Sequence, residues 1–249
     1  MMAGRMVLEP VCGVNRAAGG GTMYRYALYY VPPAGTALAE FGARWLGRDA
    51  SAPPELAGVS AEDWRRAVSG PRKYGFHATL KAPFRLAEGK DEPALADALE
   101  RFCRTRGPAP VGKLALRVLS DFLVLAPMEP LAAADLAAEC VRIFDPFRAP
   151  LTAAEIARRR PERLCASETA NLERWGYPYA MEDFRFHLTL TGPLDEGGRA
   201  RFGAGIARAV LPAIAEPVVI AGICLCGQAS PEADFVVLDR FALGRPPQR

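Results

Sequence analysis

The sequence is poor in histidine and lacks the usual spacings of metal ligands. Its 249 residues include only two histidines, and the six cysteines form no C-x-x-C pair and lie far from both histidines along the chain. Structural zinc sites need cysteine and histidine ligands at short, regular spacings, so a metal centre is not expected. With no cysteine framework for disulfides and no export signal, we expect a reducing, cytoplasmic environment.

The chain also lacks a long apolar run and a strong net charge. No run of about 20 apolar residues is present, so we expect no membrane-spanning helix and no membrane partner. The formal net charge of +3 is too small to indicate a nucleic-acid partner by itself. The length is ample for a buried core without disulfide support, and we expect a monomer.

The first 22 residues differ in character from those that follow. They read MMAGRMVLEPVCGVNRAAGGGT, in which a proline and a glutamate interrupt the apolar stretch that a secretory signal needs. A glycine run then precedes Met23, where a convincing first strand begins. We expect residues 1–22 to be a disordered extension or a mis-called start, and residues 23–249 to form a single domain.

The two histidines lie in segments of the same pattern. Residues 73–84 read KYGFHATLKAPF and residues 183–194 read DFRFHLTLTGPL, so both contain Phe-His-x-Thr-Leu. Apolar content and alternation predict strands at about 75–81 and 184–191. Side chains alternate across a strand, so each strand is expected to have a polar face opposite an apolar core face. The polar face carries His77 and Thr79 in the first strand, and His187 and Thr189 in the second.

The same succession of elements is expected after each motif. Helical spacing at 92–106 precedes two strands within 113–127, and helical spacing at 196–210 precedes strands at 217–228 and 233–243. Other expected elements are a strand at 24–31, helices at 36–47 and 61–68, and helices between 129 and 175. We interpret this as an internal duplication with two α+β lobes, at about 73–127 and 181–245, joined by a helical connection at about 128–180.

Two imidazoles facing one cleft indicate acid–base chemistry. Imidazole titrates near neutral pH, so a pair can hold one neutral ring as the base and one protonated ring as the acid. The two threonine hydroxyls can donate to phosphate oxygens, and Lys81 or Arg185 can offset phosphate charge. The set suits the opening of a phosphodiester without a metal or any other cofactor. The alternative is that duplication copied a structural pair.

Four further residues are assigned to substrate binding from their position and chemistry. Arg72 and Lys73 directly precede the first motif and can meet a terminal phosphate, although a solvated surface position is an equal alternative. Tyr74 lies beside them. Tyr26 can stack on a sugar or base, although an aromatic residue on a strand more often packs in the core.

The two motifs resemble a known superfamily. His77-Ala-Thr79-Leu80 and His187-Leu-Thr189-Leu190 are similar to the paired H-x-T/S signature of the 2H phosphoesterases, over a span from about Met23 to the C-terminus. The resemblance implies a bilobal, pseudo-symmetric α+β fold with two antiparallel sheets facing a central cleft and helices outside. Three stretches, RKYGFHATLKAPF, FRFHLTLTGPL and YRYALYYVPP, look most like a bacterial branch associated with phosphonate metabolism.

That resemblance implies a function. We predict a metal-independent cyclic phosphodiesterase acting on a small phosphorylated ribose compound, with 5-phosphoribosyl 1,2-cyclic phosphate as the candidate substrate. The predicted catalytic residues are His77, Thr79, His187 and Thr189. Two alternatives stay open, an RNA 2′,3′-cyclic phosphodiesterase, which the modest net charge disfavours, and a binding module that holds a phosphorylated ligand without chemistry.

Overall fold

The structure is a computed structural model that describes residues 23–49, 55–129 and 131–244. The predicted extension at residues 1–22 therefore lies outside the described residues. The strands are β1 (Arg25–Tyr30), β2 (Ala78–Phe84), β3 (Ala109–Gly112), β4 (Leu114–Leu119), β5 (Phe122–Pro127), β6 (Leu188–Thr189), β7 (Val218–Ile220), β8 (Gly222–Gln228) and β9 (Phe235–Ala242). The α-helices are α1 (Ala37–Trp45), α2 (Ala61–Tyr74), α3 (Glu92–Arg104), α4 (Ala134–Ile143), α5 (Ala153–Arg158), α6 (Ala166–Trp175) and α7 (Glu196–Ala209).

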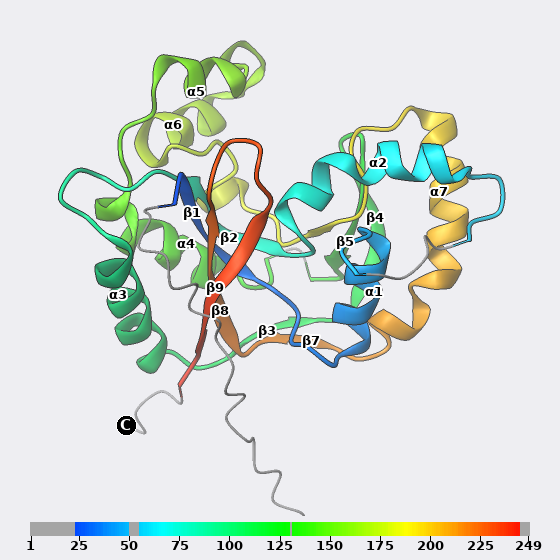
Figure 1. Ribbon diagram of the computed structural model, residues 1–249, viewed down its shortest axis with the longest axis horizontal. Coiled ribbons are helices and arrows are strands. Elements are labelled where there is room, and N and C mark those ends of the chain that lie inside the picture. The colour runs from blue at the N-terminus through cyan, green and yellow to red at the C-terminus, as the bar shows by residue number, and fades with distance from the viewer. Residues whose placement is uncertain (1–22, 50–54, 130, 245–249) are drawn as a thin grey trace, which may run out of the picture.

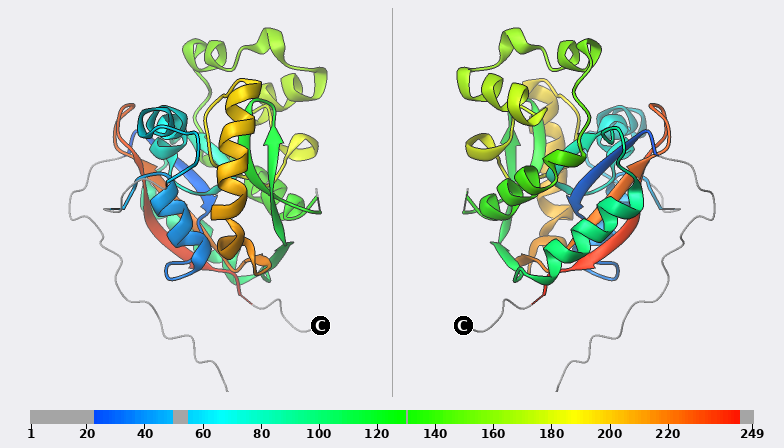
Figure 2. Two further views of the ribbon diagram at one scale, coloured as in Figure 1. Left: turned by 90° about the vertical axis from the view of Figure 1, so that its right-hand side faces the viewer. Right: turned by 90° about the vertical axis from the view of Figure 1, so that its left-hand side faces the viewer.

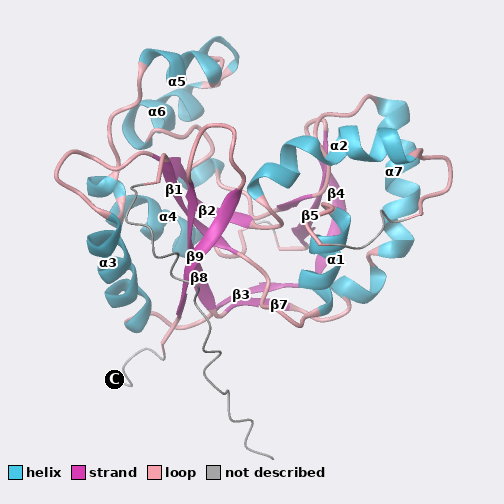
Figure 3. Cartoon of the chain, viewed as in Figure 1, coloured by secondary structure: helices cyan, strands magenta, loops and turns pink. Residues whose placement is uncertain are grey.

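The described strands form antiparallel sheets, and the fold is α+β as predicted. One sheet has the order β2-β1-β8-β9, a second has β4-β5-β6, and β3 pairs with β7 in a short third sheet that was not predicted. Figure 1 shows the first two sheets on opposite sides of the molecule, with β3 and β7 between them, and Figure 3 shows helices around the outside. Helices α5 and α6 project to one side of the sheets (Figure 2).

The order of elements repeats, but the hairpins are exchanged between the sheets. The first half runs β2-α3-β3-β4-β5 and the second runs β6-α7-β7-β8-β9. The hairpin β4-β5 pairs with β6 of the second half, whereas β8-β9 joins β2 of the first half through β1. The sheets therefore do not divide the chain into contiguous lobes at 73–127 and 181–245, because each histidine segment lies beside the hairpin of the other half.

The apolar face of both motifs is buried, as the alternation predicts. The buried residues of the first motif are Phe76, Ala78 and Leu80, and those of the second are Phe186, Leu188 and Leu190; all six belong to one core cluster. At roughly 1.5–3 kcal/mol for each large apolar side chain removed from water, this burial fixes which way the intervening residues point. His77, Thr79, His187 and Thr189 are half-buried on the opposite face.

Helix α2 holds the second histidine segment through a carbonyl that a proline leaves free. The helix was expected to end near residue 68, but it continues past Pro71 to Tyr74. Pro71 has no N–H, so the carbonyl of Ala67 lacks its helical partner. The N–H of Gly192, just after the second motif, donates to that carbonyl at 2.6 Å. Pro71 therefore leaves free the carbonyl through which α2 binds the segment that follows the second motif.

Helix α1 makes a second attachment to the same segment. The side chain of Trp45, at the end of α1, is 1% exposed, and its indole Nε1 donates to the carbonyl of Leu190 at 2.7 Å. The side chains of Thr36, Ser60, Asp91 and Thr152 cap the N-termini of α1, α2, α3 and α5, respectively. None of the described helices has the length and apolar character that crossing a membrane requires.

Candidate active site

His77 lies at a tight junction between α2 and β2. The helix ends at Gly75, whose φ of +80° is a backbone conformation that favours glycine, and β2 begins one residue after His77. The imidazole Nδ1 lies 2.8 Å from the carbonyl oxygen of Gly75, and Nε2 lies 3.2 Å from the Thr79 hydroxyl. The ring stacks on Tyr29 with centroids 3.7 Å apart.

His187 has the same local geometry in the other sheet. It directly precedes β6, and its Nδ1 lies 2.7 Å from the carbonyl oxygen of Arg185, again two residues earlier. A carbonyl only accepts, so Nδ1 carries the proton and donates in both rings. Each neutral imidazole therefore presents its basic Nε2 away from the backbone, which is the atom that could exchange a proton with a substrate.

Burial keeps both rings neutral in the free protein. Burial is the largest cause of the lowered pKa of His77, which is about 4. The charges of His187 and Arg48 also lower this pKa, whereas the hydrogen bond to the carbonyl of Gly75 raises it. Burial also lowers the pKa of His187. The charge of His187 acts on His77, so the two rings are electrostatically linked although they belong to different sheets.

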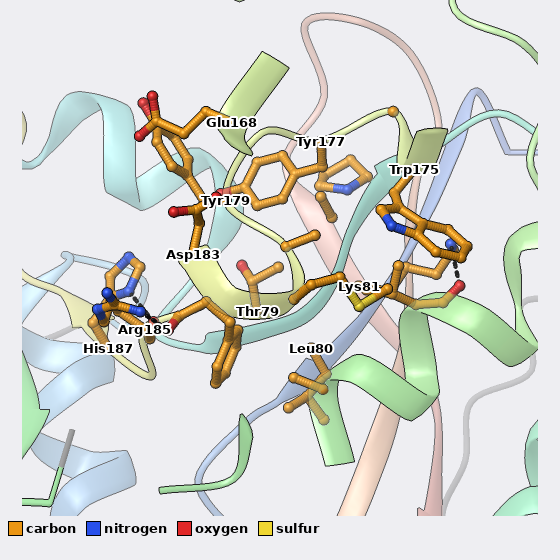
Figure 4. Close-up of a pocket in the computed structure, with 18 of the residues that line it drawn as sticks. Thr79, Leu80, Lys81, Glu168, Trp175, Tyr177, Tyr179, Asp183, Arg185 and His187 are labelled. Atoms are coloured by element: carbon orange, nitrogen blue, oxygen red, sulfur yellow. Dashed lines mark hydrogen bonds between the residues drawn. The ribbon is translucent and has the colours of Figure 1, made fainter. Parts of the chain in front are cut away.

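The motifs meet at a cavity of about 380 Å³. Thr79 of the first motif and His187 and Thr189 of the second line it. His77 is not among the lining residues, but its Nε2 lies 3.2 Å from the Thr79 hydroxyl. In Figure 4, Thr79 lies between His187 at one end of the cavity and Lys81 with Trp175 at the other. Three of the four residues that were predicted to be catalytic therefore line the cavity, and the fourth, His77, contacts one of them.

Two of the six predicted binding residues line this cavity. Lys81 is only 3% exposed, and its Nζ donates to the carbonyl of Val141 at 3.2 Å and lies 3.5 Å from Asp145. Arg185 is exposed beside His187, and its Nη1 donates to the backbone carbonyls of Glu182 and Phe184. Lys81 therefore lies at the opposite end of the cavity from His187, whereas Arg185 lies at the same end (Figure 4).

The other four predicted binding residues are not among those that line the cavity. Arg72 lies 3.4 Å from Asp234, and the Lys73 ammonium donates to the carbonyl of Pro231, so both bind the connection between β8 and β9. Tyr74 stacks on Phe235 with ring centroids 5.4 Å apart. Tyr26 is fully buried, and its hydroxyl donates to Glu92 at 3.1 Å. Each of these side chains is engaged by a residue distant in sequence.

Sequence reasoning missed Tyr29 and Arg48. Tyr29 packs on the imidazole of His77, but three tyrosines in β1 gave no indication of which one would do so. Arg48 follows α1 and binds three groups through Nη2: the carbonyl of Phe235 at 2.9 Å, the carbonyl of Lys73 at 3.3 Å and the carboxylate of Asp234 at 3.4 Å. It also lies against the turn before His77, since a Cβ added at Gly75 would be 2.7 Å from its Nη1.

Helix α6 and its connection to β6 supply most of one cavity wall. The aromatic residues Trp175, Tyr177 and Tyr179 line the cavity, and so do the carboxylates of Glu168 and Asp183. The side chains of Tyr177 and Tyr179 both face the cavity (Figure 4). Among the described residues, no group of three or more histidine, cysteine, aspartate or glutamate side chains could hold a metal ion.

Replacing Arg48 with glutamine is expected to raise the pKa of His77 from about 4 toward the ordinary value of 6.5, because a nearby positive charge is removed. Arg48→Lys retains a charge and should leave this pKa closer to that of the wild type. NMR titration of the imidazole signals measures the pKa directly, and His187→Asn assigns the two signals. An unchanged His77 pKa in a folded Arg48→Gln variant would refute this role of the arginine.

Residues 79–236 match the model of a protein family. The model of the family described as "Protein of unknown function (DUF1045)" matches residues 79–236, which is more than half of the chain. The chain belongs to this family. The matched region begins at Thr79 and includes the whole second motif, so it covers most of the residues that line the cavity.

Two curated relatives extend well beyond the chain. It is 37% identical over 237 residues to ribose 1,5-bisphosphate phosphokinase PhnN of Janthinobacterium sp. (strain Marseille), a match that covers 88% of the chain and 51% of the relative. It is 39% identical over 176 residues to the PhnN of Laribacter hongkongensis (strain HLHK9), covering 69% of the chain and 41% of that relative. The chain spans about half the length of the curated relatives it matches.

A search of solved structures finds a weak likeness. The crystal structure of E. coli LigT complexed with 3′-AMP is 14% identical with a TM-score of 0.39, and the match covers 90% of this chain and 99% of that one. A likeness at this level carries no inference about the site.

Proposed function

We propose that the chain is a cyclic phosphodiesterase that opens a cyclic phosphate on a small phosphorylated ribose compound by acid–base catalysis with two histidines. The observation that carries the proposal is the matched pair of imidazoles. Both donate through Nδ1 to the backbone carbonyl two residues earlier. His187 lines the cavity, and His77 Nε2 lies 3.2 Å from the hydroxyl of Thr79, which lines the same cavity. General acid–base catalysis of this kind contributes typically about 10²–10⁴-fold to a rate.

The proposed reaction uses one imidazole as the base and the other as the acid. The neutral imidazole takes a proton from water through Nε2, and the water oxygen attacks phosphorus. The bond from phosphorus to the ring oxygen breaks, and the protonated imidazole gives its Nε2 proton to that leaving oxygen. Water is consumed, and a phosphomonoester and a hydroxyl result. Burial lowers the pKa of both rings, and the negative charge of the bound diester would raise the proton affinity of the ring that acts as the acid.

The names of the relatives support a direction for ring opening. Hydrolysis of 5-phosphoribosyl 1,2-cyclic phosphate at the bond between O2 and phosphorus would yield ribose 1,5-bisphosphate, the compound on which the PhnN relatives are named to act. A fused hydrolase and kinase would then catalyse consecutive steps, which is consistent with the place in phosphonate metabolism that we propose. The chain contains no G-x-x-x-x-G-K-[ST] loop, so its own residues give the phosphokinase name no support.

A second candidate function is supported by the aromatic wall. Trp175, Tyr177 and Tyr179 offer stacking surfaces of the kind that bind nucleobases, so a nucleoside or RNA 2′,3′-cyclic phosphate is the alternative substrate. The proposal that the protein only binds a phosphorylated ligand predicts binding of either compound without turnover.

A comparison of substrates separates these three functions. We expect kcat/KM for 5-phosphoribosyl 1,2-cyclic phosphate to exceed that for 2′,3′-cyclic AMP by at least tenfold, followed by phosphorus NMR. Turnover should survive an excess of EDTA, because the proposed steps use only imidazole and water. A reversed preference would favour the nucleotide enzyme, and binding of both compounds without ring opening would favour the binding module.

A further inference from the structure

The end of the cavity remote from His187 is built from two cations that share one carboxylate. Lys81 and Arg148 both line the cavity. Asp145 accepts from Arg148 Nε at 2.8 Å and from Nη2 at 3.3 Å, and the Lys81 ammonium lies 3.5 Å from the same carboxylate. The side chains of Lys81 and Arg148 are 3% and 14% exposed, so this is a largely buried group.

This group has a surplus positive charge. Two cations face one carboxylate, and the carbonyls that they also bind are uncharged: Lys81 donates to Val141, and Arg148 donates to Ala149 and Arg174. Burial lowers the pKa of Lys81 to about 8, which leaves the ammonium mostly protonated at neutral pH. A buried charge without full compensation is costly, and an anion entering the cavity would offset that cost.

The carboxylates that line the cavity are occupied elsewhere. Glu168 accepts from the backbone N–H of Cys165 at 2.9 Å, and Asp183 accepts from Asn171 at 3.0 Å. Figure 4 shows both carboxylates toward the His187 end, away from Lys81. They therefore leave the cationic end available to an anion, and they lie where sugar hydroxyls could donate to them.

The spacing along β2 suits a ligand with two phosphates. Lys81 lies four residues after His77, and a strand rises about 3.3 Å per residue, so the two backbones are roughly 13 Å apart. Thr79, between them, lines the cavity. This separation is sufficient for a pentose with a phosphate at each end.

We propose that Lys81 and Arg148 form a binding subsite for a phosphomonoester, the second phosphate of a substrate whose cyclic phosphate lies between the histidines. The inference rests on the proposed function for what occupies the histidine end. It adds a basis for selectivity, because a cyclic phosphate without a second anionic group would leave the cationic end without a partner. Hydrogen bonds between charged groups and phosphate are the strong ones, so this contact should dominate ground-state binding.

Calorimetric titration with ribose 5-phosphate, compared with ribose, tests the subsite without requiring turnover. The wild type is expected to bind ribose 5-phosphate at least tenfold more tightly than ribose, and Lys81→Met or Arg148→Gln to lose at least tenfold of that affinity. The matched control is Arg142→Gln, an exposed arginine on α4 that should change nothing.

A third variant, for which the opposite change in affinity is expected, distinguishes phosphate binding from a structural role. Asp145→Asn removes the carboxylate that competes for the two cations, so it should tighten ribose 5-phosphate binding, whereas a purely structural triad would lose affinity in all three variants. The subsite is refuted if the wild type binds ribose 5-phosphate no better than ribose, or if folded Lys81→Met and Arg148→Gln bind it as the wild type does. Retained binding with no opening of any cyclic phosphate would instead refute the proposed function alone.

Discussion

Replacing either His77 or His187 with asparagine is expected to reduce turnover of the cyclic phosphate by about 10²–10⁴-fold. The asparagine amide can still donate to the carbonyl two residues earlier, at Gly75 or Arg185, as Nδ1 does. It lacks Nε2 and cannot exchange a proton near neutral pH. The local turn is therefore retained while the proton transfer is lost. Initial rates by phosphorus NMR measure the effect.

The double variant sharpens this prediction. Because the two rings act on one proton transfer sequence, the variant His77→Asn/His187→Asn should be little slower than the worse single variant. Circular dichroism and thermal unfolding establish that the variants are folded. A folded single variant that retains more than a tenth of wild-type turnover would exclude the histidine from the catalytic step.

Truncating Trp45 to alanine is expected to lower the free energy of unfolding by about 3–5 kcal/mol. The indole is fully buried between α1 and the second histidine segment, so the change leaves a large cavity and removes the hydrogen bond to the carbonyl of Leu190. Trp45→Phe retains most of the ring but leaves that carbonyl without its donor, at a cost of about 1–3 kcal/mol. Urea unfolding followed by circular dichroism gives both values.

Trp175 provides the matched control for this prediction. It is half-buried at the cavity rather than in the core, so Trp175→Ala should cost clearly less stability than Trp45→Ala. Equal losses in the two variants, or a loss below about 1 kcal/mol for Trp45→Ala, would contradict the role assigned to Trp45 as an attachment between α1 and Leu190.

The repeated motif was sufficient to predict the local part of the fold. Phe-His-x-Thr-Leu fixes an alternation in which Phe76 and Phe186 must be buried, and the polar face follows from it. The exchange of hairpins was not predictable in this way. Whether β5 pairs with β6 or with β2 depends on contacts between segments more than 60 residues apart, such as Val124 with Thr189, and no local pattern encodes such a choice.

The positions of the motif residues at the cavity followed from the sequence, whereas contacts with residues distant in the chain did not. Arg72 and Lys73 lie next to the motif in sequence, but Asp234 and Pro231, from the far end of the chain, bind them. Tyr29 rather than Tyr26 meets the imidazole because Tyr29 lies opposite Thr79 in the pairing of β1 with β2, whereas Tyr26 lies opposite Phe84, and the register shifts between the two tyrosines. A β-bulge of this kind leaves no reliable trace in a single sequence.

The exposed helical connection had no clear function at the level of sequence. Trp175 and Tyr177 are among its residues that line the cavity, and no motif in the sequence marks them. The only available signal was a concentration of aromatic residues just before the second motif. Pro71 predicts a helix end from sequence alone. In the structure it instead leaves the carbonyl of Ala67 free to accept from the N–H of Gly192.

The role of the paired imidazoles is tested most directly by hydrolysis of 5-phosphoribosyl 1,2-cyclic phosphate in ¹⁸O-labelled water with excess EDTA, followed by phosphorus NMR. We predict conversion to ribose 1,5-bisphosphate with one ¹⁸O in a non-bridging position of the phosphate on C1, and no conversion by the double asparagine variant. An unchanged cyclic phosphate signal at stoichiometric wild-type enzyme, or equal conversion by the double variant, would contradict it.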